Sequence, residues 1–385
     1  MSRPAPLAGI RILDLTRLLP GPVATLHLAD LGAEVIKIED PQVGDYARTL
    51  GTGTGEDSAY FRMINRNKQG LRLDLKKPEG VEIFLRLASE ADVIVESFRP
   101  GVVDKLGIGY ATVAALNPKI AYCSISGYGQ DGPYKDLAGH DINYLGYAGV
   151  LDQIGLEGSQ PAIPNFQIAD LLGGALTGVM GILAAVLEAQ RTGQGRYIDV
   201  SMTDSVLAHT YFTMLRLNDA GSSAPRGTDL LSGGLPCYAT YRCADGKYMA
   251  VGALEGKFWQ VCCAVLDRPD WVRRQWDAGL RAEMAELFAT RPRDDWAASF
   301  GAFDCCVTPI LTPEEALRNE QLTARGMIVE EAGLTQFAPP LKMSDYQFGI
   351  RQPAPKAGEH NEAILHAAGY SPDDIARLKQ SGALG

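Results

Sequence analysis

The first half of the chain alternates short apolar runs with segments in which apolar residues recur at helical spacing. Five short runs have the composition of buried strands, at 10–15, 34–38, 71–75, 92–96 and 120–125. Helical patterns separate some of them, at 23–31 and 78–91. Strands that alternate with helices form parallel sheets covered by helices. The pattern therefore predicts an α/β fold with a large, Rossmann-like, doubly wound sheet.

The second half of the chain follows a different pattern. A long helix at 170–191 and a strand at 197–202 precede a Gly- and Ser-containing stretch, and a hairpin at 237–253 followed by helices then predicts a smaller α+β domain. We therefore expect four regions. They are a large α/β domain at 1–195, linker helices at 196–230, the small domain at 231–330, and a segment at 331–385 that returns to the large domain.

The turn after the first predicted strand reads TRLLPGPVA. It contains neither the GxGxxG pattern of dinucleotide-binding turns nor a P-loop. A dinucleotide-dependent oxidoreductase is therefore disfavoured, although such enzymes use a sheet of this kind.

Charge is distributed unevenly along the chain. The 36 basic and 46 acidic residues give a net charge of -10, which would repel a phosphate backbone and argues against nucleic-acid binding. Between residues 62 and 77, however, basic side chains outnumber a single acid, Asp74, and Arg99 follows another predicted strand. The basic residues of this segment are Arg62, Arg66, Lys68, Arg72, Lys76 and Lys77. The segment is a candidate anion site, or else a solvated surface with lysines closing a strand.

Three features bear on the cellular environment. Seven cysteines, with two adjacent pairs, make a poor disulfide framework and a poor metal site, so we expect buried thiols, a reducing compartment and no bound metal. The N-terminal residues lack a signal-peptide pattern. The uncharged residues 171–187 contain four glycines and have charged flanks, which favours a buried helix over a membrane span. We expect a cytoplasmic protein.

Three acid–base side chains occupy positions that could carry chemistry. Asp170 opens the long helix, where Gly173 and Gly174 would let an anionic oxygen approach backbone N–H groups. His140, in AGHDINY, could take and return a proton near neutrality, and Glu255 follows the predicted hairpin in VGALEGKFW. Each also has a structural interpretation: an N-cap for the aspartate, a structural histidine, and a glutamate that opens the next helix.

Several long segments, in the same order, resemble the class III CoA-transferase superfamily, also called the CaiB/BaiF family. They are PLAGIRILDLTRLLPGPVATLHLADLGAEVIKIE, NRNKQGLRLDLK, ADVIVESFRPGVVDKLGIGY, SISGYGQDGPY and GEHNEAILHAAGYSPDDIARLKQSGAL. The resemblance implies a large α/β domain, a small domain and an interlocked homodimer. It also implies that coenzyme A (CoA), as part of an acyl-CoA substrate, lies along the large domain. The phosphate contacts that it implies are Arg66, Lys68, Arg72 and Arg99, with Lys37 in place of an arginine that racemases can carry where this chain has Asp40.

Within this family, AGHDINYLGYAGVL, IADLLGGAL and GALEGKF resemble the α-methylacyl-CoA racemase branch. That resemblance implies His140 and Asp170 as proton-transfer residues on opposite faces of the substrate, with Glu255 supporting the histidine. The implied reaction is racemisation of 2-methylacyl-CoA thioesters through an enolate, without a metal or redox cofactor. The alternative is a CoA-transferase in which Asp170 forms an aspartyl-CoA thioester.

Overall fold

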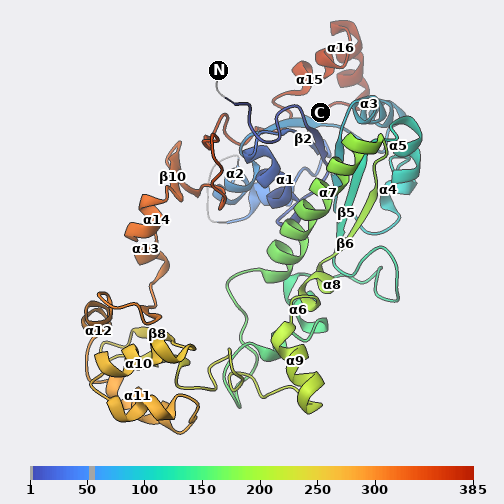
Figure 1. Ribbon diagram of the computed structural model, residues 1–385. Coiled ribbons are helices and arrows are strands. Elements are labelled where there is room, and N and C mark those ends of the chain that lie inside the picture. Colours follow the sequence, from blue (N-terminus) through green and yellow to red (C-terminus); the bar gives the residue numbers. More distant parts are fainter. Residues whose placement is uncertain (1–2, 52–56) are drawn as a thin grey trace. The chain divides into compact units, whose positions relative to one another are not determined.

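The computed structural model describes residues 3–51 and 57–385, which form two compact units (Figure 1). The first unit comprises Met1–Ala148, Asn165–His209 and Arg325–Gly385, and the second comprises Gly149–Pro164 and Thr210–Ala324. The expected boundary at residue 195 therefore lies within the first unit. The segment 331–385 belongs to that unit as well.

A six-stranded parallel sheet forms the centre of the first unit. Its order is β3-β2-β1-β4-β5-β6, the doubly wound order in which the chain reverses direction beside β1. The strands are β1 (Arg11–Asp14), β2 (Glu34–Glu39), β3 (Lys68–Arg72), β4 (Val93–Glu96), β5 (Ala121–Ser126) and β6 (Tyr197–Ser201). The predicted α/β class and Rossmann-like sheet are confirmed.

Strand β3 begins three residues before the apolar run 71–75. Its first residue, Lys68, is fully buried, because its ammonium contacts Asp14 Oδ2 at 3.1 Å and Asn65 Oδ1 at 2.8 Å. A charged side chain that is paired inside the core does not register as a strand residue in a hydrophobicity pattern. This accounts for the shifted start.

Helices cover both faces of the sheet (Figure 1). One face packs against α3 (Pro78–Ala88), α4 (Val102–Lys105), α5 (Tyr110–Leu116), α15 (Asn361–Ala367) and α16 (Pro372–Ser381). The other face packs against α1 (Pro20–Asp30) and α7 (Thr177–Thr192). The first unit also contains α2 (Ala59–Asn65), α6 (Asp141–Tyr147), α8 (Met202–Leu207) and the hairpin of β10 (Ile328–Glu331) and β11 (Leu334–Phe337).

A continuous helix, Ala169–Thr192, runs from the edge of the sheet along β5 and β6. It starts with a π-helical segment, η3 (Ala169–Leu176), and continues as α7. With a mean hydropathy of 1.9, it is long and apolar enough to cross a membrane, a test that core helices of soluble proteins also pass. Gly178, Ile182 and Val186 bury one face of α7 in the first unit. The interpretation as a core helix fits that face.

The second unit is built on a three-stranded antiparallel sheet of β7 (Tyr238–Arg242), β8 (Tyr248–Gly252) and β9 (Val307–Pro309). Gly246, with φ of 79°, makes the turn of the predicted hairpin. The sheet packs against α10 (Gly256–Val265), α11 (Leu280–Phe288) and α12 (Arg293–Phe300) around a core that includes Trp259 and Phe288. Shorter elements are α9 (Tyr211–Ala220), α13 (Pro313–Ala316) and α14 (Glu320–Ala324).

Candidate active site

A cavity of about 740 Å³ lies in the first unit, at the carboxyl ends of β1, β4 and β5. Side chains from four loop segments, 15–20, 97–100, 125–128 and 135–144, form most of its wall, and Asp170 completes it beside them. Open α/β sheets bind their ligands at this edge, and the volume suits a small-molecule site. The cavity is therefore the candidate active site.

Asp170 lies in the first turn of η3 and borders the cavity. Burial, and secondarily the negative charge of Asp141, raise the pKa of its carboxyl from 3.8 to about 7. A carboxyl with this pKa is partly protonated at neutral pH. It can therefore either accept or donate a proton.

Asp141 ties the two candidate proton-transfer residues to one another. Its Oδ1 accepts hydrogen bonds from the backbone N–H groups of Ala169, at 2.7 Å, and Asp170, at 3.0 Å. The structural interpretation of Asp170 as an N-cap therefore does not hold, because its own N–H is one of the capped groups. Since Asp141 directly follows His140, the hydrogen bonds join the segment that carries the histidine to the helix that carries the aspartate.

Gly173 and Gly174 have a packing role, in contrast to the anion-binding role expected from the sequence. Both are buried. A Cβ on Gly173 would lie 2.8 Å from the carbonyl oxygen of Met202, and one on Gly174 would lie 2.6 Å from the Cβ of Pro20. The two glycines therefore let η3 approach α8 and α1 closely, which fixes the position of Asp170.

His140 is exposed and borders the same cavity as Asp170. It is the N-cap residue of α6, and its backbone N–H donates to Asn143 Oδ1 at 3.0 Å. The preceding Gly139 carbonyl accepts a hydrogen bond from the Tyr144 hydroxyl. These contacts hold the backbone of the histidine while leaving its imidazole at the cavity wall.

Glu255 lies in the second unit, where it is exposed and directly precedes α10. Its backbone is the N-cap of that helix, which agrees with the structural interpretation made from the sequence. Its side chain makes no capping hydrogen bond. A role toward His140 stays a prediction.

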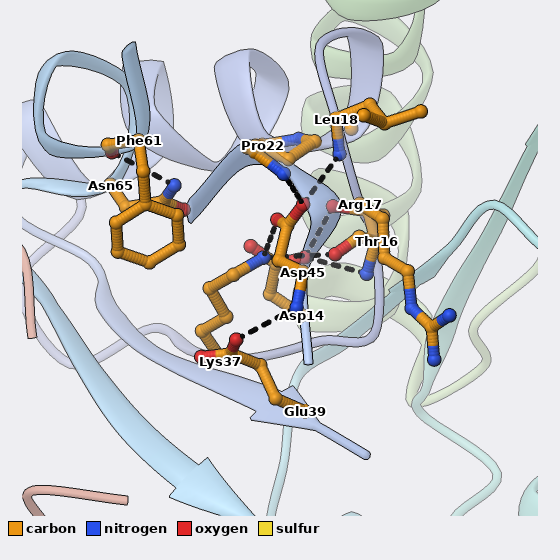
Figure 2. Close-up of polar contacts among 12 residues, drawn as sticks. Asp14, Thr16, Arg17, Leu18, Pro22, Lys37, Glu39, Asp45, Phe61 and Asn65 are labelled. Carbon is orange, nitrogen blue, oxygen red and sulfur yellow. Dashed lines mark hydrogen bonds and ion pairs between the residues drawn. The ribbon is translucent and has the colours of Figure 1, made fainter. Parts of the chain in front are cut away.

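Three of the expected phosphate contacts are buried and paired inside the first unit, and Figure 2 shows one of them, Lys37, beside Asp45. Lys37 Nζ lies 2.8 Å from Asp45 Oδ2 and donates to the Thr16 carbonyl at 2.9 Å. Lys68 contacts Asp14, and burial lowers its pKa to about 8. These ammonium groups are held by internal partners and offer no free charge at the surface.

Arg66 shows the same behaviour. Its guanidinium pairs with Asp30 Oδ2 at 2.6 Å and donates to the Phe337 carbonyl at 2.7 Å. Arg72 is half-buried and does not border the cavity, whereas Arg99 is exposed and borders it. Within the basic segment, Arg66 and Lys68 are therefore structural, because each pairs with an acid on a neighbouring element, whereas Lys76 is exposed at the surface.

Sequence reasoning missed three residues at or beside the cavity: Asp141, Arg17 and Lys135. The first stands next to His140 in AGHDINY, and a polar triplet of histidine, aspartate and asparagine was its only signal. Arg17 and Lys135 border the cavity from loops, where the spacing of residues in the sequence does not show which way a side chain points. No group of three or more His, Cys, Asp or Glu side chains within residues 3–51 and 57–385 is arranged to hold a metal.

The sequence matches the model of CoA-transferase family III over residues 7–361. Alpha-methylacyl-CoA racemase from Homo sapiens is 35% identical over 97% of this chain and 96% of its own length. Succinyl-CoA:glutarate CoA-transferase from Mus musculus is 32% identical over 98% of this chain and 90% of its own length. Among solved structures, a CAIB/BAIF family protein from Brucella suis has a TM-score of 0.84 at 30% identity, covering 95% of this chain and 100% of that one. The matched residues span both units.

Proposed function

Because the chain belongs to CoA-transferase family III, we propose that it racemises 2-methylacyl-CoA thioesters by removing and returning the proton at the α-carbon. The observation that carries the proposal is that Asp170, with a pKa of about 7, borders one cavity together with His140. The similarity to alpha-methylacyl-CoA racemase supports it further.

The proposed reaction requires two groups in opposite protonation states. A proton beside a thioester is weakly acidic, so one face of the α-carbon needs a base, the other needs a donor, and the enolate between them needs stabilisation. We assign one face to Asp170 and the other to His140.

Two further assignments rest on the family resemblance. We propose that Glu255, from the second unit, supports His140 as a third group of the acid–base set. The reaction needs no cofactor besides the CoA of the substrate itself. We also propose a cytoplasmic enzyme, in line with six buried free thiols among its seven cysteines.

The test is incubation of one enantiomer of a 2-methylacyl-CoA in deuterated water without any acceptor acid. We expect deuterium at the α-carbon, measured by mass spectrometry, together with loss of stereochemical purity, measured by chiral chromatography. Recovery of the pure, undeuterated enantiomer across several acyl chains would exclude racemisation.

Single-base variants make the test sharper. His140→Ala and Asp170→Ala should each lower racemisation by roughly 100- to 10,000-fold, the contribution of a positioned acid or base. Each variant should still exchange the α-proton of one enantiomer, because the remaining base reaches one face only, and the two variants should act on opposite enantiomers. Equal exchange of both enantiomers by either variant would contradict the two-face assignment.

The second candidate is a CoA-transferase that uses Asp170 as a nucleophile, favoured by the transferase relatives at 31–32% identity. In that reaction the carboxylate attacks the thioester carbonyl and expels the CoA thiolate, which leaves a mixed anhydride on Asp170. The thiolate then attacks the aspartyl carbonyl and releases the acyl group as a free carboxylate, so that Asp170 carries CoA as a thioester. Hydroxylamine would convert such an intermediate into a hydroxamate on Asp170. We expect no such modification by peptide mass spectrometry, and a stoichiometric hydroxamate would make the transferase the better assignment.

We also propose that the protein is a homodimer, as the resemblance implies. The continuous helix Ala169–Thr192 exposes Leu176, Met180, Leu183 and Leu187, which recur at coiled-coil-like spacing. A stripe of this kind on a soluble helix is a candidate contact between copies.

Light scattering should give twice the 41.4 kDa of one chain. Met180→Glu combined with Leu187→Glu should shift the protein toward monomer, because two charges would enter the apolar contact. Gln380→Glu, an exposed change on α16 and not on this helix, is the matched control. A monomeric wild-type protein at micromolar concentration would contradict the dimer, and an unchanged dimer in the double variant would place the contact elsewhere.

A further inference from the structure

The wall of the active-site cavity is positively charged in a protein that is negative overall. Arg17, Arg99 and Lys135 border it, whereas Asp170 is the one acid among the described residues that line it. The whole chain carries a net charge of -10. A local excess of cations at a site inside an acidic protein favours an anionic ligand.

Arg17 differs from the other two cations because it borders two cavities. A second cavity, of about 240 Å³, shares Leu15, Arg17 and Phe98 with the first. It is lined mainly by apolar side chains, including Leu73 and Leu75. Arg17 therefore stands at the junction between the cavity that holds Asp170 and an apolar cavity next to it.

The guanidinium of Arg17 lies near two aromatic rings. It lies 5.7 Å from the ring centre of Tyr46 and 5.9 Å from that of Phe98. No carboxylate among residues 3–51 and 57–385 lies within ion-pair distance of it. Arg48 and Arg66, by contrast, each pair with a buried carboxylate. Arg17 thus keeps a free, planar set of donors.

The buried ion pair Lys37–Asp45 fixes the backbone on both sides of Arg17 (Figure 2). Lys37 Nζ donates to the carbonyl of Thr16, and Asp45 Oδ1 accepts from the N–H of Leu18 at 3.0 Å. Leu18 has a φ of 64°, a conformation that a leucine adopts only under constraint. In Figure 2 the side chain of Arg17 extends away from the ion pair. The network therefore sets the direction of this one side chain.

We infer that Arg17 binds the diphosphate of the CoA substrate, and that Lys37 and Asp45 are positioning residues for it. This rests on the proposed function, because it presumes a CoA thioester. A guanidinium matches two phosphate oxygens with parallel hydrogen bonds, which an ammonium cannot do. The thioester end of the ligand lies in the cavity of Asp170, and the nucleotide end lies in the apolar cavity beyond Arg17.

The experiment compares CoA with pantetheine, which lacks the diphosphate and the nucleotide, by isothermal titration calorimetry. We expect Arg17→Gln to weaken the binding of CoA by about 10- to 100-fold. The ratio of CoA affinity to pantetheine affinity should fall by the same factor. Arg17→Lys should recover only part of the loss. CoA affinity should fall less steeply with added salt in Arg17→Gln than in the wild type, because one phosphate contact is missing.

Arg11→Gln is the matched control, since Arg11 lies at the opposite end of β1 and pairs with Glu34 and Glu90 away from both cavities. It should leave the ratio unchanged. Equal weakening of CoA and pantetheine by Arg17→Gln, or an unchanged affinity for CoA, would overturn the inference. Because calorimetry needs no turnover, a protein that binds CoA through Arg17 but exchanges no α-proton would refute the racemase proposal and leave the diphosphate contact standing.

Discussion

Replacing Asp170 by asparagine should make the protein more stable at alkaline pH. The pKa of this carboxyl is about 7 in the folded protein, against an ordinary 3.8. As pH rises through this interval, the unfolded chain loses the proton while the folded chain still holds it. The free energy of unfolding therefore falls from about pH 4 to pH 7, and this loss of stability stays constant above pH 7. An asparagine side chain is neutral at every pH, so the variant avoids the penalty.

The full difference in pKa corresponds to roughly 4 kcal/mol, at about 1.4 kcal/mol for each pKa unit. The carboxyl borders an open cavity, so solvent reduces this figure. We expect Asp170→Asn to raise the free energy of unfolding by about 1–2 kcal/mol at pH 8, and by less than about 0.5 kcal/mol at pH 4.5. Activity should be lost in the same variant, because the carboxyl that transfers the proton is removed.

Urea unfolding of wild type and variant at pH 4.5 and pH 8 measures both values. Asp136→Asn, which changes an exposed acid of the same unit, is the control and should show no such pH dependence. A gain of equal size at the two pH values would mean that packing, and not the raised pKa, is responsible. A variant less stable than the wild type at pH 8 would refute the reasoning.

Two further predictions concern the supports of the same carboxyl, and a third concerns the reaction. Asp141→Asn keeps an acceptor but removes a charge, so the inflection of kcat/KM that Asp170 sets near pH 7 should move down by roughly half to one pH unit; an unmoved inflection would contradict the charge effect. Gly174→Ala should cost about 1–3 kcal/mol by urea unfolding, because its Cβ would meet Pro20 at 2.6 Å, whereas Gly146→Ala, which meets nothing within 4 Å, should not. The pH profile of kcat/KM should have the same shape in both directions of racemisation, because the ratio of the two is a pH-independent equilibrium constant.

The sheet could be predicted because strands such as β4 and β5 are almost entirely buried and a covering helix, α3, is amphipathic. The same rule failed at the start of β3, where Lys68 is buried through its contact with Asp14. Hydrophobic periodicity describes residues that avoid water by themselves. It has no means of finding a charge that is buried by a partner from another strand.

The site was predicted in part for a similar reason. Asp170 and His140 border one cavity, and residue type and local motif were enough to select them. The glycines after Asp170 were given the wrong role, because their neighbours, Met202 and Pro20, come from distant parts of the sequence. Arg17 had no signal at all, since a lone arginine in a loop looks the same whether it faces solvent or a ligand. Position in the fold, which only tertiary structure supplies, separates these cases.

The buried cations nevertheless leave a sequence signal that composition alone obscures. In a parallel sheet, residues at matching positions of adjacent strands are neighbours, and Asp14 at the end of β1 is in register with Lys37 on β2. Both side chains are fully buried and each meets an opposite charge, Asp14 from Lys68 and Lys37 from Asp45. An acid and a lysine near the ends of neighbouring strands therefore predict buried ion pairs before they predict a ligand contact. Burying such a pair costs solvation free energy, which apolar residues at the same positions would not lose. The pair is therefore better explained by the groups that it positions than by a gain in stability. Here Lys37 donates to the carbonyl of Thr16, the residue just before Arg17. The sequence suggested Lys37 as a phosphate contact, whereas the proposal makes it the support of one.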